Sequence, residues 1–353
     1  MSATDDKKLL AMLVHRGLLD QVQAKAAWAS SDPGQQLIAA GACTAAQWEQ
    51  WRRTDAGTRP ELSRYEIGDL LGQGGTARVF RARDKTSGDS VALKILLPEL
   101  CNDRLAVERF VSEARLLVEL RHDGLVRGLR VAREGAVIFL AMQVVPGECL
   151  QDRLARGEVL DEDEALRIVV QVAAVLGYLH ERGLVHRDVK PGNILWDDDR
   201  EHAVLIDLGF AARTASDASA QTGTTVGTVH YISPEQAQGA AALDVRADIY
   251  SLGATLYHLV TGELPFAGAT GEEVIAKQVL ESLSSDKIRA LQLSPQLHYF
   301  IEKMMAKEKE IRFQAPGQLA TEVEAYLAAR DHERSQTERE PKAGRRRRRR
   351  PLF

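Results

Sequence analysis

One short polar run constrains this chain more than any other feature. His186-Arg187-Asp188-Val189-Lys190-Pro191-Gly192-Asn193 is followed, eleven positions further on, by Val204-Leu205-Ile206-Asp207. The apolar triplet in the second segment is typical of a short buried strand, so Asp207 should emerge at the carboxyl end of that strand. Carboxylate and amide oxygens are the ligands that Mg²⁺ prefers, which makes Asn193 and Asp207 candidate metal ligands. Asp188 is a candidate proton acceptor.

The first segment resembles the catalytic loop of a protein kinase, with its H-R-D-x-x-x-x-N signature. The resemblance implies an α+β, two-lobed protein kinase fold over residues 65–330, with a small β-rich N-lobe and a larger helical C-lobe. It also implies roles for the polar residues. Asp188 would orient a substrate hydroxyl and take its proton, while Lys190 would neutralise charge on the transferred phosphoryl group. Asn193 and Asp207 would hold Mg²⁺.

A second group of residues resembles a kinase nucleotide site. The glycine-rich turn Leu71–Val79 lies between two strand-like runs, and its glycines allow the backbone to approach phosphates closely. The resemblance pairs Lys94 with the phosphates and with Glu113 of the helix expected over 103–120, with Glu108 and Glu119 as alternatives to Glu113. Met142 would be the gatekeeper of the hinge 143–145. The expected ATP-binding residues are Leu71, Gly72, Gln73, Gly74, Gly75, Val79, Ala92, Lys94, Glu113, Met142, Val144 and Leu195.

The segment between Gly209 and Ser233 is rich in Ser, Thr, Ala and Gly and resembles an activation segment. Its candidate phosphosites are Thr222, Thr224 and Thr225, and Arg187 would pair with such a phosphate. The alternative is that these hydroxyls only solvate a loop. Lys190 and Thr228, by resemblance, indicate serine/threonine rather than tyrosine kinases.

Further motifs resemble the eukaryotic-like serine/threonine kinases of bacteria. Ser233-Pro234-Glu235-Gln236-Ala237 and Asp248-Ile249-Tyr250-Ser251-Leu252-Gly253 carry this resemblance. The family implies that Glu235 pairs with Arg312 and that Asp248 holds the backbone of the catalytic loop. It also implies that the Gly-Thr and Ser-Pro-Glu elements form a peptide-binding segment.

The implied function is transfer of the γ-phosphoryl group of ATP to protein Ser or Thr hydroxyls, with ATP and Mg²⁺ as cofactors and protein substrates as partners. Autophosphorylation of the activation segment would regulate it. Two alternatives remain open. One is a pseudokinase scaffold that acts through the N-terminal segment, and the other is a small-molecule kinase, which shares the Asp/Asn/Asp chemistry.

The regions that flank the expected kinase domain differ from it in composition. Residues 1–53 contain an internal repeat, because Leu13 through Gln23 matches Leu37 through Gln47. Each copy predicts a helix, a glycine stop, a capping residue and a second helix. This helical segment is either a structural appendage or a docking site for a protein partner. The polar residues 54–64, with Gly and Pro, predict a linker.

The predicted disordered tail, residues 331–353, holds six arginines at 345–350, although the whole chain has a net charge of −4. Such a run is able to contact anionic surfaces, although a solvated tail is the usual alternative. The three cysteines show no C-x-x-C spacing, which favours a reducing compartment. We therefore expect a cytoplasmic protein without a transmembrane segment.

Overall fold

The computed structural model describes residues 10, 13–14, 19–28, 30, 32–44, 48, 60–208, 212–213, 228–240, 242–283 and 293–339. The chain divides into two compact units. Residues 1–69 and 82–89 form the first unit, and residues 70–81 and 90–353 form the second.

The described part of residues 1–53 contains helices α2 (Gln21–Trp28) and α3 (Pro33–Ala39). Equivalent positions of the predicted repeat are buried in both copies, Leu13 with Leu37 and Leu19 with Cys43. Two further pairs of equivalent positions exchange large and small residues. Leu10 and Ala24 of the first copy correspond to Gly34 and Trp48 of the second, and a Cβ added to Gly34 would overlap the Trp48 indole. The buried apolar cluster of this segment consists of Leu10, Leu13, Leu19, Ala27, Leu37, Cys43 and Trp48.

The last residues of the predicted linker are anchored to the turn that follows strand β2 (Ala77–Asp84). Arg64 donates from Nε to Asp84 Oδ2 at 2.8 Å, and its terminal nitrogen lies 2.7 Å from the same oxygen. The hydrogen bond from Arg64 holds the pKa of the Asp84 carboxyl at about 2, well below its usual range. Lys85 Nζ donates to the carbonyl of Leu62 at 3.0 Å, and the Leu62 side chain is buried. Residues 60–64 therefore do not form a free connection.

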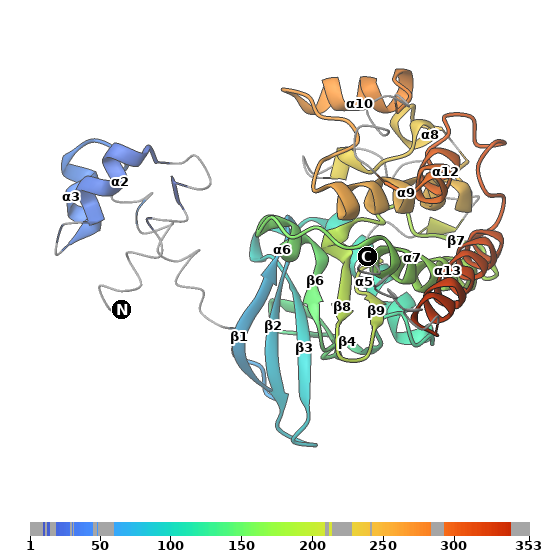
Figure 1. Ribbon diagram of the computed structural model, residues 1–353. Helices are drawn as coiled ribbons and strands as arrows, with labels where there is room; N and C mark the ends of the chain where they lie inside the picture. The colour runs from blue at the N-terminus through green and yellow to red at the C-terminus, as the bar shows by residue number, and fades with distance from the viewer. Residues whose placement is uncertain are drawn as a thin grey trace, which may run out of the picture. The chain divides into compact units, whose positions relative to one another are not determined.

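The β-rich lobe is a five-stranded sheet with the order β1-β2-β3-β5-β4, and helix α5 (Arg104–Glu119) connects β3 to β4 (Figure 1). Asp103 caps α5 by accepting hydrogen bonds from the N–H groups of Leu105 and Ala106. Strand β3 runs antiparallel to β5, which places Lys94 opposite Leu140 and Ala92 opposite Met142. The other strands are β1 (Tyr65–Gln73), β3 (Ser90–Leu96), β4 (Gly128–Glu134) and β5 (Val137–Gln143).

The larger lobe is helical and packs around α7 (Glu162–His180) and α9 (Val245–Thr261). A small sheet with the order β6-β8-β9 and the strand pair β7 and β10 lie in the same lobe. The predicted two-lobed α+β fold is confirmed. The remaining helices are α6 (Leu150–Ala155), α8 (Pro234–Ala237), α10 (Gly271–Leu280), α12 (Pro295–Met304) and α13 (Pro316–Arg339). The short strands are β6 (Glu148–Cys149), β7 (Leu184–Val185), β8 (Ile194–Asp197), β9 (His202–Leu205) and β10 (Ala212–Arg213), and the 3₁₀ turns are η1 (Pro98–Leu100), η2 (Pro191–Asn193) and η4 (Thr228–His230).

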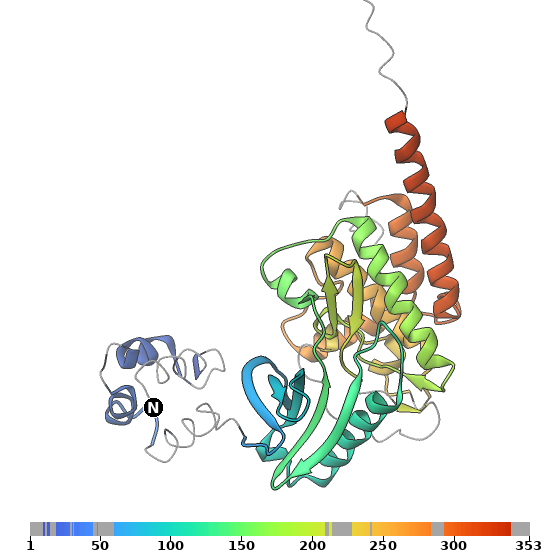
Figure 2. The ribbon, with the colours of Figure 1, turned by 90° about the horizontal axis from the view of Figure 1, so that it is seen from below.

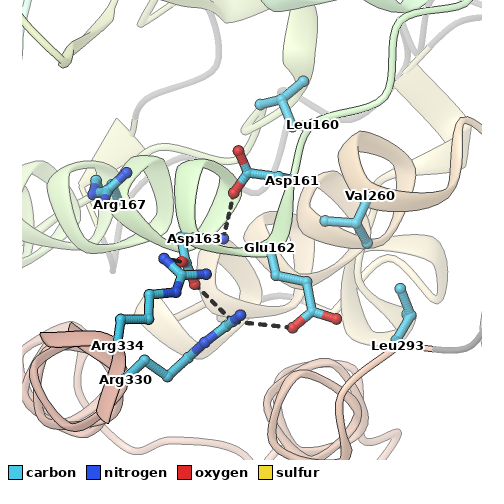
Figure 3. Close-up of a pocket in the computed structure, with 9 residues that line it drawn as sticks. All are labelled: Leu160, Asp161, Glu162, Asp163, Arg167, Val260, Leu293, Arg330 and Arg334. Carbon is cyan, nitrogen blue, oxygen red and sulfur yellow. Dashed lines mark hydrogen bonds and ion pairs between the residues drawn. The ribbon is translucent and has the colours of Figure 1, made fainter. Parts of the chain in front are cut away.

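Helix α13 extends past residue 330, where the sequence predicted that a disordered tail begins. Residues 331–339 are helical, which corrects that prediction, and 340–353 lie outside the described residues. The helix packs along α7 (Figures 1 and 2). Ion pairs fix its outer half: Asp163, in the first turn of α7, lies 2.6 Å from Arg330 Nη1 and 2.5 Å from Arg334 Nη1 (Figure 3). These contacts between distant segments order a stretch that has no apolar periodicity of its own.

We expect Asp163→Asn to lower the free energy of unfolding by about 1 kcal/mol, because it removes the charge from two ion pairs that are partly exposed to solvent, and such pairs contribute about 0.2–1 kcal/mol each. Asp163 is only 4% exposed, whereas Arg334 is half exposed, so part of the ion-pair energy is screened. Urea denaturation of the full chain measures the change. Asp331→Asn on the exposed side of α13 is the matched control, and an equal effect of the two substitutions would contradict the prediction.

Candidate active site

A buried carboxylate holds the backbone of the loop 186–193. Asp248, in the first turn of α9 and 1% exposed, accepts hydrogen bonds from the N–H groups of His186 at 2.8 Å and Arg187 at 2.7 Å. Arg187 has a φ of 69°, a conformation that costs a non-glycine residue energy unless the surroundings impose it. The expected contact between Asp248 and this loop is therefore present, and it fixes the conformation of the residue before Asp188.

Gln236 holds the other side of Arg187, a role that the sequence does not predict. Its Nε2 donates to the carbonyl of Arg187 at 2.9 Å, and its Oε1 accepts from the N–H of Ser233 at 3.1 Å. Gln236 belongs to the quoted motif 233–237, but nothing in that motif indicates which backbone group an amide would reach. The motif thus connects α8 to the catalytic loop.

Asp188 lies at the centre of a polar cluster. Lys190 Nζ is 2.9 Å and 2.8 Å from its two carboxylate oxygens, and Asn193 donates from Nδ2 to its Oδ2 at 3.0 Å and to its carbonyl at 2.7 Å. Burial raises the pKa of Asp188, Lys190 opposes the shift, and the charge of Asp207 adds to it. Asp188 is 7% exposed, so its carboxylate is an acceptor with a fixed orientation.

A second cluster joins strand β3, helix α5 and the segment after β9. Lys94 Nζ lies 2.6 Å from Glu113 Oε1 and 2.9 Å from Asp207 Oδ1. Burial alone would lower the pKa of Lys94, but the charges of Asp207 and Glu113 outweigh it and raise that pKa above its usual value. Burial and the charge of Asp207 raise the pKa of Glu113.

The structure also distinguishes Glu113 from the two alternatives on the same helix. Glu113 is 9% exposed and faces Lys94. Glu108 is exposed and pairs with Arg104 one turn away, and Glu119 is also exposed. The predicted pairing of Lys94 with Glu113 is thus present.

The glycine-rich turn leaves its backbone accessible. Gly74 donates its N–H to the carbonyl of Ala77 at 2.9 Å, which closes the turn. A Cβ added at Gly72 or Gly75 would meet no heavy atom within 4 Å, so neither glycine is required by packing within the protein. These residues fit a ligand that approaches the backbone closely, as a chain of phosphates does.

The residues expected from the sequence to contact an adenine ring lie in both lobes and are mostly apolar. Ala92 and Met142 are buried in the core, and the partly buried Val79 and Val144 pack against it. Leu195 is half buried on β8, while Leu71 and Gln73 are exposed at the end of β1. This mixture of buried and open apolar side chains fits a nucleotide base.

The donor set at Asn193 and Asp207 fits a hard divalent cation. Both side chains offer oxygen ligands, and the backbone joins them, since Ile206 donates its N–H to the carbonyl of Asn193 at 2.9 Å. The Asp207 side chain is 32% exposed, so it remains accessible to a ligand.

The last expected contact closes the helical lobe. Arg312 donates from its two terminal nitrogens to the Glu235 carboxylate at 2.7 Å and 2.9 Å, and its side chain is fully buried. The candidate phosphosites Thr222, Thr224 and Thr225 lie outside the described residues, as does the side chain of Thr228.

Comparison with known proteins agrees with this geometry. The model of the protein kinase domain matches residues 65–323, and the chain therefore belongs to the protein kinase family. Within that family, its relatives are serine/threonine kinases of bacteria, as the sequence motifs predicted. The chain is 35% identical over 272 residues to the serine/threonine-protein kinase PknB of Mycobacterium leprae, which covers 75% of this chain and 43% of the relative.

Two other relatives give the same result. A probable serine/threonine-protein kinase of Streptomyces coelicolor is 32% identical over 271 residues, covering 75% of this chain and 40% of the relative. One of Clostridium perfringens is 34% identical over 262 residues, covering 74% and 38%. The chain thus spans about two fifths of the length of the curated relatives that it matches. Among the described residues, no helix is both long enough and apolar enough to cross a membrane.

Proposed function

We propose that this protein is a serine/threonine protein kinase, which transfers the γ-phosphoryl group of ATP to Ser or Thr hydroxyls of proteins. The arrangement around Asp188 carries the proposal: a buried carboxylate held by Lys190 and Asn193, with the Asn193 carbonyl accepting a hydrogen bond from the N–H of Ile206, next to Asp207. Lys94, held by Glu113, contacts the same Asp207. The similarity to bacterial serine/threonine kinases supports this assignment.

Mg²⁺ and ATP, when bound, supply the transferable phosphoryl group and part of the charge neutralisation that its transfer needs. Asn193 and Asp207 would hold the metal, and Lys94 and the turn 71–79 would hold the phosphates. Asp188 orients the incoming hydroxyl and accepts its proton at a carboxylate oxygen. Lys190 stabilises the negative charge that develops beside it.

The test is mass spectrometry of the full chain incubated with ATP, with either Mg²⁺ or EDTA, and with either myelin basic protein or small alcohols such as choline. The proposal requires Mg²⁺-dependent phosphate on Ser or Thr of the protein substrate. Phosphate on the small alcohol alone would favour a small-molecule kinase. No transfer to any substrate, or to the chain itself, would overturn the proposal and favour a scaffold.

The flanking segments extend the proposal beyond the kinase domain. Residues 1–53 would dock a protein partner, and Arg345–Arg350 would contact an anionic surface. We also propose a cytoplasmic location, because Cys43, Cys101 and Cys149 are free thiols.

The activation segment gives a separate prediction. Replacing Thr222, Thr224 and Thr225 together by alanine is expected to lower kinase activity, because a phosphate of about −2 charge could no longer pair with Arg187. Phosphopeptide mapping and initial rates measure the effect, with Thr86→Ala on the β2–β3 turn as the control. Equal turnover of the triple variant and the wild type would remove this mode of regulation.

A further inference from the structure

Residues 229–236 contain the Ser-Pro-Glu part of the candidate peptide-binding segment and end beside the catalytic loop. Their C-terminal end is attached through Gln236, which donates to the carbonyl of Arg187 next to Asp188. A shift of their N-terminal end, at Val229 and His230, would therefore alter where a bound peptide lies relative to Asp188. This N-terminal end is held by Gln278.

Gln278 of α10 is fully buried and binds the backbone of η4. Its Nε2 donates to the carbonyl of His230 at 2.7 Å and lies 3.4 Å from that of Val229. Its Oε1 accepts from the hydroxyl of Tyr250 at 2.6 Å. A buried amide with both ends bonded has one favourable orientation, because rotation of the amide would leave buried polar atoms without partners.

Two neighbours lock Gln278 in this place. Lys307 Nζ donates to the backbone carbonyl of Gln278 at 2.6 Å and to the Tyr250 hydroxyl at 3.0 Å. The same ammonium lies 4.3 Å from the centre of the Phe266 ring. Gln278, Tyr250 and Lys307 thus form a closed set of hydrogen bonds between α10, α9 and the segment after α12.

Two other contacts keep η4 and the next residue in register with the helical lobe. His230 Nδ1 lies 3.3 Å from the carbonyl of Phe266, and the Tyr231 hydroxyl lies 2.7 Å from His258 Nδ1. Neither contact reaches the carbonyls that Gln278 binds. Gln278 therefore makes a separate contribution to the position of η4.

We propose that Gln278 is a positioning residue for the protein substrate: its amide fixes the carbonyls of Val229 and His230, and thereby sets where the peptide-binding segment presents a substrate hydroxyl to Asp188. This inference rests on the proposed kinase function. Gln278 touches none of the residues assigned to ATP or metal, so its effect falls on the peptide substrate and not on the nucleotide.

The test compares Gln278→Met with Tyr250→Phe in the full chain, at saturating Mg²⁺ and ATP, with a peptide from myelin basic protein as the varied substrate. Loss of one hydrogen bond of about 1–1.5 kcal/mol to the segment corresponds to about a 5–13-fold rise in the KM for the peptide. The KM for ATP stays within about twofold of the wild type, since a tenfold change would require about 1.4 kcal/mol. Tyr250→Phe removes the bonds to Gln278 Oε1 and Lys307 but leaves the donor to His230, so it should raise the peptide KM less than Gln278→Met does.

Gln278→Leu is the second variant, in case Gln278→Met does not fold. It also removes the amide donor to the His230 carbonyl, so the peptide KM should again rise. If the wild type transfers no phosphate, the proposed function fails and the inference falls with it. If the wild type is active but the Gln278 variants keep the wild-type peptide KM, the inference alone fails. A rise in Tyr250→Phe equal to that in Gln278→Met would also overturn it, because general loosening of the lobe would then explain both.

Discussion

Replacing Asp188 by asparagine is expected to lower kcat by about 10²–10⁴-fold, the usual contribution of a general base. The variant keeps a side chain of the same shape, and the backbone of the loop stays fixed by Asp248 and Gln236. What it loses is the carboxylate oxygen that accepts the proton, together with the charge that pairs with Lys190. Initial rates of phosphate transfer to protein substrate measure the loss.

The control for this prediction is Asp331→Asn on α13, which should match the wild type. Circular dichroism and the melting temperature establish that Asp188→Asn is folded. A folded Asp188→Asn protein that retained the wild-type rate would exclude this aspartate as the base. One that lost the rate but kept every cellular role would favour a scaffold.

Replacing Lys94 by methionine is expected to lower kcat/KM for ATP by about 10²–10³-fold, in the range found when one electrostatic donor is removed from an active site. Lys94 is 9% exposed and contacts two carboxylates, so the variant leaves Glu113 and Asp207 close together without a cation between them. The phosphates would then meet two negative charges instead of an ion pair. ATP-dependent rates and direct ATP binding measure the two parts of the effect.

Helix α5 offers a matched pair of variants for the same ion pair. Glu113→Gln removes the partner of Lys94, whereas Glu108→Gln removes only an exposed contact with Arg104. Glu113→Gln should reduce kcat/KM for ATP. Glu108→Gln should not, because its exposed ion pair contributes only about 0.2–1 kcal/mol to stability and does not contact the active site. Equal kinetics of Glu113→Gln and Glu108→Gln would show that the contact between Lys94 and Glu113 does not affect the reaction.

The sequence was informative wherever a motif fixes its own geometry. The loop 186–193, the strand before Asp207 and the flanking motifs define the fold class and bring Asp188, Lys190 and Asn193 together. The choice of Glu113 over Glu108 followed from the resemblance of its neighbouring residues to the kinase family. In each case a few consecutive side chains determine both the backbone conformation and the direction of the polar group.

Features that depend on distant segments could not be predicted in the same way. Gln278 meets His230 across 48 positions of the chain, and Arg334 of α13 meets Asp163 across a larger interval. Neither residue lies in a motif. The residues next to a glutamine in the sequence do not show whether its side chain is buried or exposed to solvent. The helical extension to Arg339 was missed for this reason, because its order comes from ion pairs with α7 and not from its own pattern.

Residues 60–64 are attached to the end of β2 and to the turn after it, immediately before strand β1. A pull applied to that segment would first load the ion pair between Arg64 and Asp84 and the hydrogen bonds of Lys85. Strand β1 begins at Tyr65, one residue beyond this attachment, and leads to the glycine-rich turn. These contacts fix the backbone at the entrance to strand β1 without involving the glycine-rich turn 71–79.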